Sequence, residues 1–105
     1  MKTTLVRYRV KPEDAERNRE LIRAVYTELE LTQLADIRYA TFQLDDGVSF
    51  VHLHASDSER SPLVDLPAFR AFQEGIKDRC DEQPVFAELN TVGSFGWFPD
   101  HGTDR

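Results

Sequence analysis

The stretch from Ile37 to Ala55, IRYATFQLDDGVSFVHLHA, constrains the fold of this chain more than any other. Two runs rich in β-branched and aromatic residues flank the sequence Asp45-Asp46-Gly47. An Asp-Gly pair between two such runs is a strong signal for a β-hairpin. A single hairpin is only marginally stable in water, so the rest of the chain must supply further strands and helices that cover them.

A two-residue turn at Asp46-Gly47 determines which residues of the hairpin lie opposite one another. One face then carries the pairs Leu44/Ser49, Phe42/Val51 and Ala40/Leu53, and the other carries Gln43/Phe50, Thr41/His52 and Tyr39/His54. Because the first set is the more apolar, we predict that it packs against the helices and that the second set faces away from them. A three-residue turn with a bulge would shift the register and change both sets.

The other segments predict two helices and two more strands. Residues 3–10 alternate in the manner of a strand, and apolar residues at helical spacing predict a helix from Pro12 to about Leu31. After a polar loop, a second helix is expected from Leu66 to Cys80, with Asp65 as its N-cap. A last strand is expected from Val85 to Phe95.

The order of these elements is β-α-β-β-α-β, which is typical of an α+β ferredoxin-like sandwich: a four-stranded antiparallel sheet with two helices on one face. We expect one domain over residues 1–98 and a flexible C-terminal tail over residues 99–105. The uncovered face of the sheet would carry Leu5, Tyr39 and Phe50 beside polar residues. Because such a face is too apolar to be left to water, we predict a homodimer that stacks two sheets face to face.

An apolar cluster made of Phe95, Trp97 and Phe98 lies at the end of the predicted last strand. Side chains of this kind either complete the core of their own chain or pack on a partner subunit. Both alternatives are open at this point.

Composition excludes several classes of function. The chain has 13 basic and 19 acidic residues and a formal net charge of -6, which argues against a nucleic-acid partner because phosphate binding depends on Lys and Arg. The single cysteine, Cys80, cannot form an intramolecular disulfide, which favours a cytoplasmic location. No apolar run is long enough to span a membrane, so no membrane association is expected.

The element order and the local sequence resemble the dimeric α/β-barrel superfamily, and within it small proteins of the antibiotic biosynthesis monooxygenase type. The segments that carry the resemblance are Val10-Lys11-Pro12, the hairpin arm DDGVSFVHLHA, the second-helix sequence LPAFRAFQEGI and the late sequence VGSFGWF. This resemblance implies a dimeric α/β barrel. In the enzymatic members it also implies the oxidation of aromatic or polycyclic small molecules without a bound flavin or metal.

The chain departs from its enzymatic relatives in two respects. Haem-degrading relatives use a histidine on the second helix, and the segment from Leu66 to Cys80 has none. Cofactor-free oxygenases use a Trp and an Asn near the pocket, and the only Trp here is Trp97. No catalytic residue is therefore carried over from the family, haem degradation is disfavoured, and no cofactor is expected.

Four polar residues are the candidates for catalysis: His52, His54, Arg7 and Tyr39. The two histidines are two residues apart on a strand, so they project from the same face, and imidazole titrates near neutrality as general acid–base catalysis requires. In the strand order 4-1-3-2 the first and third strands are neighbours. We therefore predict that Arg7 or Arg9 stands beside His52 or His54, where it would bind a carboxylate or an enolate. The alternative is structural: histidines hydrogen-bonded in a dimer interface, and an ion pair between Arg7 and an acid such as Glu88.

No metal site is expected, because a third ligand is needed and no Asp or Glu lies on the histidines' face of the first three strands, where Tyr39 is the possible neighbour. Two hypotheses for the function follow. The first is a monooxygenase-like oxidoreductase that acts on an aromatic small-molecule ligand without a cofactor. The second is a non-catalytic homodimeric protein that binds a ligand or is associated with stress.

Overall fold

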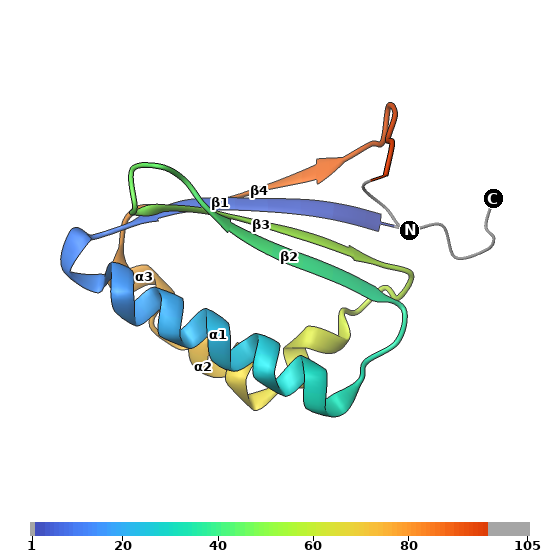
Figure 1. The fold of residues 1–105 in the computed structure, drawn as a ribbon, viewed down its shortest axis with the longest axis horizontal. Helices are drawn as coiled ribbons and strands as arrows, with labels where there is room; N and C mark the ends of the chain where they lie inside the picture. Colours follow the sequence, from blue (N-terminus) through green and yellow to red (C-terminus); the bar gives the residue numbers. More distant parts are fainter. Residues whose placement is uncertain (1, 97–105) are drawn as a thin grey trace.

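The structure, a computed structural model, describes residues 2–96 as a single antiparallel sheet with helices on one face (Figure 1). Its elements, in chain order, are β1 (Lys2–Val10), η1 (Pro12–Asp14), α1 (Ala15–Thr32), β2 (Ile37–Gln43), β3 (Ser49–Ser56), η2 (Pro62–Asp65), α2 (Pro67–Glu74), α3 (Ile76–Arg79) and β4 (Cys80–Leu89). The four strands lie in the order β2-β3-β1-β4. The predicted α+β ferredoxin-like fold is therefore confirmed.

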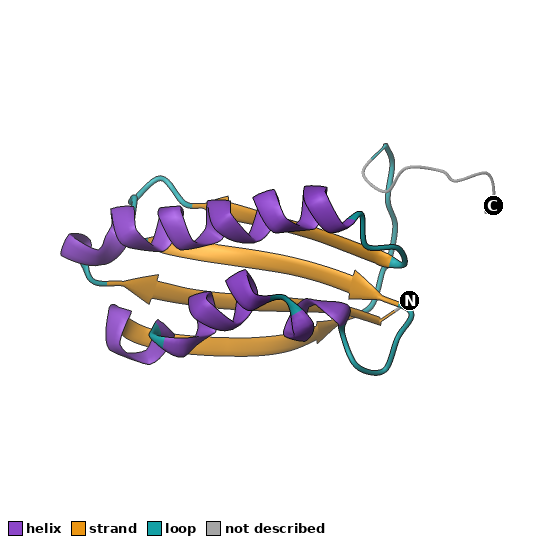
Figure 2. Cartoon of the chain, turned by 90° about the horizontal axis from the view of Figure 1, so that it is seen from below, coloured by secondary structure: helices purple, strands orange, loops and turns teal. Residues whose placement is uncertain are grey.

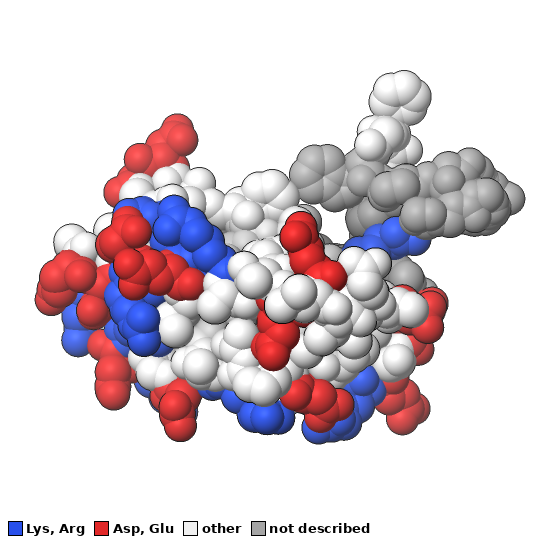
Figure 3. Space-filling view, turned by 60° about the horizontal axis from the view of Figure 1, so that its bottom comes forward, with Lys and Arg blue, Asp and Glu red and all other residues white. Residues whose placement is uncertain are grey.

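Both helical segments lie on the same side of the sheet, α1 beside α2 and α3 (Figure 2). The core lies between these two layers, and its most buried side chains include Tyr8, Val10, Val25 and Phe50. Figure 3 shows acidic and basic side chains intermingled on the helical side of the molecule, with uncharged surface between them. None of the described helices is both long enough and apolar enough to cross a membrane.

The first predicted helix is confirmed, and the structure divides it into a 3₁₀ turn, η1, and the long helix α1. Pro12 begins the 3₁₀ turn, where its fixed φ suits a first helical position. The helix ends at Thr32, because the next residue, Gln33, has a left-handed backbone with φ 53° and donates its N–H to the carbonyl of Leu29. Such a left-handed residue is a common end for a helix.

The second predicted helix is broken in the structure. It is interrupted at Gly75, where a side chain would lie 3.1 Å from a guanidinium nitrogen of the buried Arg79. The glycine thus leaves room for this arginine under the helix. The prediction that Asp65 caps the helix is wrong, because its carboxylate instead accepts from Arg60 at 2.9 Å.

The last strand begins and ends earlier than predicted. It runs from Cys80 to Leu89 rather than from Val85 to Phe95, and it contains Pro84. A proline is tolerated there because β4 is an edge strand, and the pairing with β1 is irregular at this point.

After the last strand the chain leaves the sheet (Figure 1). Phe95 is fully exposed, so of the two alternatives, core completion is excluded for this residue, and packing on a partner subunit stays a prediction. Trp97 and Phe98 lie outside the described residues, as does the predicted tail over residues 99–105.

The hairpin has the predicted register, with Phe42 opposite Val51 and Tyr39 opposite His54. Its turn is held by the carboxylate of Asp46, which accepts from two backbone N–H groups and from a serine hydroxyl. Gly47 has a left-handed backbone with φ 78°, which glycine adopts at no steric cost.

The prediction of which hairpin face meets the helices is wrong. Phe50 and His52, which are 1% and 5% exposed, face the helices, whereas Phe42 is 40% exposed and lies on the opposite face. The more polar face can be buried because its polar atoms pair with one another: the His52 ring is hydrogen-bonded to Tyr8, Tyr39 and Thr41. The prediction assumed that burying polar groups costs free energy, but a buried polar group that is fully hydrogen-bonded largely avoids this cost.

Candidate functional site

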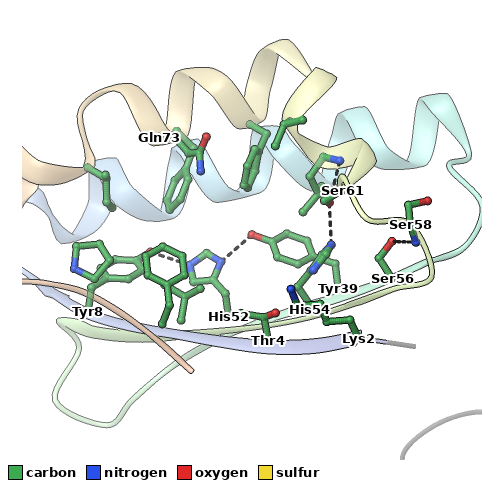
Figure 4. Close-up of a pocket in the computed structure, with 18 of the residues that line it drawn as sticks. Lys2, Thr4, Tyr8, Tyr39, His52, His54, Ser56, Ser58, Ser61 and Gln73 are labelled. Atoms are coloured by element: carbon green, nitrogen blue, oxygen red, sulfur yellow. Dashed lines mark hydrogen bonds between the residues drawn. The ribbon is translucent and has the colours of Figure 1, made fainter. Parts of the chain in front are cut away.

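A pocket of about 320 Å³ lies between the sheet and the helical layer (Figure 4). Aromatic side chains dominate its walls: Tyr8 and Tyr39 from the sheet, and Phe69 and Phe72 from α2. Phe86 of the edge strand β4 also lines it and is 68% exposed, so the pocket opens to solvent at this edge. A mainly apolar cavity of this size, with a few polar groups, is typical of a site for a small molecule.

His52 lies at the centre of the pocket wall, and both of its ring nitrogens are engaged (Figure 4). Its Nε2 is 2.8 Å from the hydroxyl of Tyr8, and its Nδ1 is 2.7 Å from the hydroxyl of Tyr39. Thr41 Oγ1 lies 3.2 Å from the same Nδ1. Burial lowers the pKa of His52 to about 4, so its imidazole is neutral at neutral pH.

His54, two residues further along β3, lines the same pocket but is less deeply buried. Its Nε2 lies 2.8 Å from the hydroxyl of Ser61, which holds the ring in place (Figure 4). No residue within 2–96 is hydrogen-bonded to its other ring nitrogen. Burial also lowers the pKa of His54 below its usual 6.5. The free ring nitrogen can accept a proton from a bound molecule in the tautomer in which Nε2–H donates to the Ser61 hydroxyl.

The hydroxyl groups of Tyr8 and Tyr39 remain protonated at any physiological pH. Burial, the largest cause in both cases, raises the pKa of each phenol well above its usual 10.0. Neighbouring rings hold Tyr39 in position: it stacks on Tyr26 at a centroid distance of 5.3 Å and meets the edge of Phe69 at 6.5 Å. These tyrosines can donate and accept hydrogen bonds, but they cannot serve as phenolate bases.

Behind the pocket, a chain of hydrogen bonds continues from Tyr8 into the helical layer. Asn18 of α1, which is fully buried, donates from Nδ2 to the Tyr8 hydroxyl at 2.9 Å. Arg79 of α3 donates from Nε to Asn18 Oδ1 at 3.0 Å and from Nη2 to the carbonyl of Phe72 at 2.7 Å. Sequence reasoning did not assign Asn18 or Arg79 to the site. The signal in the sequence that points to Asn18 is that it is a polar residue on the apolar stripe of the first helix.

Neither Arg7 nor Arg9 lines the pocket, so the prediction that one of them stands beside the histidines is wrong. In the sheet Arg7 lies opposite Val51 and Val85, whereas His52 lies opposite Val6. Side chains alternate between the two faces of a strand, so Arg7 projects from the face that the helices leave bare. The predicted acidic partner, Glu88, lies opposite Thr4, a pocket residue, and thus on the other face.

No set of three or more His, Cys, Asp or Glu side chains in the described part of the chain is arranged to hold a metal ion. Cys80 is buried, and burial raises the pKa of its thiol. The titratable side chains that line the pocket are the two histidines, Tyr8, Tyr39, Lys2 and Glu59.

Neither the protein-family models nor the curated proteins give a match to this chain. Solved structures, in contrast, do match it. A candidate antibiotic biosynthesis monooxygenase from Nitrosomonas europaea is 19% identical, with a TM-score of 0.73 over 89% of this chain and 100% of that one. PA3566 from Pseudomonas aeruginosa is 16% identical, with a TM-score of 0.71 over 88% and 94% of the two chains. Rv0793 from Mycobacterium tuberculosis is 15% identical, with a TM-score of 0.69 over 89% and 96%.

At these identities the likeness establishes a shared fold. It covers nearly the whole of each chain and includes structures described as antibiotic biosynthesis monooxygenases. The resemblance noted in the sequence is therefore confirmed at the level of the fold.

Proposed function

We propose that this protein binds an aromatic or polycyclic small molecule in the pocket between sheet and helices and promotes its oxidation by dioxygen without a bound cofactor. The observation that carries the proposal is the pocket itself, with its aromatic walls and a ring nitrogen of His54 that no described residue engages. The fold shared with candidate monooxygenases supports the proposal.

The proposed reaction begins with a substrate methylene that lies between aromatic rings and is conjugated through them with a carbonyl. Neutral His54 removes one proton, and the resulting carbanion, delocalised onto the carbonyl oxygen, reduces dioxygen and forms a carbon–oxygen bond. The hydroperoxide then loses water and leaves a second carbonyl. In total, the methylene loses two hydrogens and gains one oxygen atom, and the other oxygen atom leaves as water.

The candidate catalytic residues have different roles in this proposal. His54 is the base and Tyr39 contacts the substrate. His52 is a positioning residue, because both of its nitrogens are already bonded to protein hydroxyls. Arg7 has no role in this pocket, because it lies on the opposite face of the sheet.

The replacement His54→Gln is expected to lower kcat for the oxidation of anthrone to anthraquinone by about 100-fold or more, the usual contribution of a general base. Glutamine keeps a hydrogen bond within reach of Ser61 but cannot accept the proton. The reaction is followed by quinone absorbance and by an oxygen electrode, with the spontaneous oxidation subtracted. One dioxygen is expected to be consumed per quinone formed.

Two controls accompany this measurement. Glu74→Gln, an exposed change on α2 outside the pocket lining, is expected to leave kcat unchanged. Because the neutral imidazole is the base, wild-type activity is expected above the pKa of His54 and is lost as the pH falls through it, with a midpoint below 6.5. An unchanged kcat in His54→Gln would remove His54 from the mechanism. Binding of anthrone without turnover by the wild type would support the alternative, a non-catalytic binding protein.

We further propose that the chain forms a homodimer through the bare face of the sheet, as the sequence predicted. This face carries apolar side chains from all four strands, among them Leu5, Phe42, Leu53 and Val85. Phe42 is 40% and Val85 67% exposed. Exposed apolar side chains on one face, here around Arg7, are typical of a protein–protein interface.

The replacement Phe42→Glu is expected to convert this dimer to a monomer, because pairing would bury a carboxylate whose cross-strand neighbour, Val51, is apolar. Light scattering is expected to give about twice 12.1 kDa for the wild type and 12.1 kDa for the variant. The matched control is Leu31→Glu, at a residue that is 80% exposed near the end of α1, and it is expected to remain dimeric. A wild-type mass of 12.1 kDa would contradict this proposal.

A cytoplasmic location is also part of the proposal. Its support is chemical: Cys80 is a free thiol, and free thiols without disulfides are typical of a reducing compartment.

A further inference from the structure

We infer that a buried arginine, Arg79, determines the direction of the hydrogen-bond chain behind the pocket, and that Tyr39 at the far end therefore presents its O–H to a ligand oxygen. This inference rests on the proposed function for the existence of a ligand. It deepens the proposal by naming the class of ligand: an aromatic molecule with a carbonyl or phenolate oxygen.

The chain begins at a group that can only donate. The guanidinium of Arg79 has no acceptor atom and stays charged in proteins. It is 8% exposed and forms no ion pair within residues 2–96; its donors go to Asn18 Oδ1 and to the carbonyl of Phe72. The amide oxygen of Asn18 must therefore face Arg79, which leaves its NH₂ group to face Tyr8.

Tyr8 transmits this direction to His52. Its hydroxyl oxygen accepts from Asn18, and its own hydrogen has one nearby acceptor, the Nε2 of His52 at 2.8 Å. If Nε2 carried a hydrogen, the O–H of Tyr8 would be left without an acceptor in a side chain that is only 3% exposed. A buried donor without a partner is costly, so Nε2 is the unprotonated nitrogen.

His52 in turn transmits the direction to Tyr39. Because His52 is neutral at neutral pH, its single N–H hydrogen must be on Nδ1. This Nδ1–H donates to the Tyr39 hydroxyl at 2.7 Å. The oxygen of Tyr39 is thus occupied as an acceptor, and toward the pocket Tyr39 acts as a donor (Figure 4).

Within residues 2–96, Thr41 is the group that competes for the hydrogen of Tyr39. Its hydroxyl lowers the pKa of the Tyr39 phenol, against the larger effect of burial. Thr41 Oγ1 also lies 2.9 Å from the Tyr26 hydroxyl and 3.2 Å from His52 Nδ1, so other donors can satisfy it. A ligand oxygen can therefore take the Tyr39 hydrogen without leaving Thr41 unsatisfied.

A donor at this position has a chemical consequence. An aromatic ketone or a phenolate carries an oxygen that accepts hydrogen bonds, and the apolar walls contact the rest of the molecule. When a proton is removed next to a carbonyl, negative charge develops on the carbonyl oxygen. A preorganised O–H donor stabilises that charge, as donors in oxyanion holes do.

The first test needs no ligand. Nitrogen NMR of the histidine rings is expected to show His52 as the neutral Nδ1–H tautomer. In the nearly isosteric variant Asn18→Asp, the carboxylate still accepts from Arg79 but can only accept from Tyr8. Tyr8 must then accept from His52, and the tautomer is expected to switch to Nε2–H.

The control for this test is Tyr26→Phe, which removes a hydroxyl bonded to Thr41 but leaves the chain to His52 intact. It is expected to keep the Nδ1–H tautomer. An Nε2–H tautomer in the wild type would overturn the inference, even if Asn18→Asp failed to fold. In a folded Asn18→Asp protein, any state of His52 other than Nε2–H would also overturn it.

The second test uses two probes that differ in one oxygen, α-tetralone and tetralin. Wild type is expected to bind the ketone about tenfold more tightly, the value of one net hydrogen bond, and Tyr39→Phe is expected to abolish this preference. Asn18→Asp is expected to abolish it too, although Asn18 does not line the pocket. An unchanged preference in either variant would contradict the inference. If wild type bound neither probe, the proposed function would lose support, and the NMR test would still decide the direction of the chain.

Discussion

Phe50→Ala is expected to lower the free energy of unfolding by about 3–5 kcal/mol, the usual cost of truncating a buried phenylalanine. The side chain of Phe50 is 1% exposed and stacks on Tyr8, with ring centroids 5.6 Å apart and an interplanar angle of 13°. Its removal would leave a cavity beside the ring that anchors His52. Urea denaturation followed by circular dichroism measures the change.

The matched control for this change is Phe42→Ala, in the same hairpin but on the opposite face and 40% exposed. Within one chain it is expected to cost about 1 kcal/mol or less, since little of the ring is withdrawn from water by its own chain. If Phe42 also stabilises a dimer, that contribution to the free energy of unfolding depends on protein concentration. Denaturation at several protein concentrations separates it from the contribution within one chain. A larger concentration-independent cost for Phe42→Ala than for Phe50→Ala would mean that the helices cover the other face.

Acidification is expected to lower the free energy of unfolding by about 3 kcal/mol through His52 alone. Each unit of difference between its pKa in the folded and unfolded states contributes about 1.4 kcal/mol. In the folded state burial lowers the pKa of His52 from 6.5 to about 4. As the pH falls below 6.5, the unfolded chain takes up a proton that the folded chain excludes, so unfolding becomes more favourable. The loss is complete near pH 4, where the folded state is protonated as well.

His52→Gln is the reference for this measurement, because glutamine keeps polar atoms in the site but does not titrate. Its free energy of unfolding, determined by urea denaturation at a series of pH values, is expected to vary less between pH 6.5 and 4 than that of the wild type. His54 and the carboxylates titrate in both proteins, so their contribution cancels in the difference. Parallel curves for the two proteins would show that His52 is not buried as a neutral ring.

Local patterns in the sequence were sufficient for the elements and their order. The Asp46-Gly47 turn determined the register of the hairpin, and the spacing of apolar residues in α1 determined which side of that helix is buried. These features depend on residues close together in the chain, where turn chemistry and periodicity act directly. The break between α2 and α3 at Gly75, by contrast, lies against the buried guanidinium of Arg79, a contact that periodicity does not report.

The sequence by itself therefore determined a β-α-β-β-α-β chain with a four-stranded sheet. It also placed His52, His54 and Tyr39 on one face of the hairpin. Only the tertiary structure decided that this face is the buried one. Its polar atoms find their partners across the fold: Tyr8 lies 44 residues from His52, and Asn18 lies 61 residues from Arg79. A count of hydrophobic residues along the strand predicts that such a face is exposed to solvent. It fails here because the hydrogen bonds that satisfy the polar atoms form only when distant segments pack together.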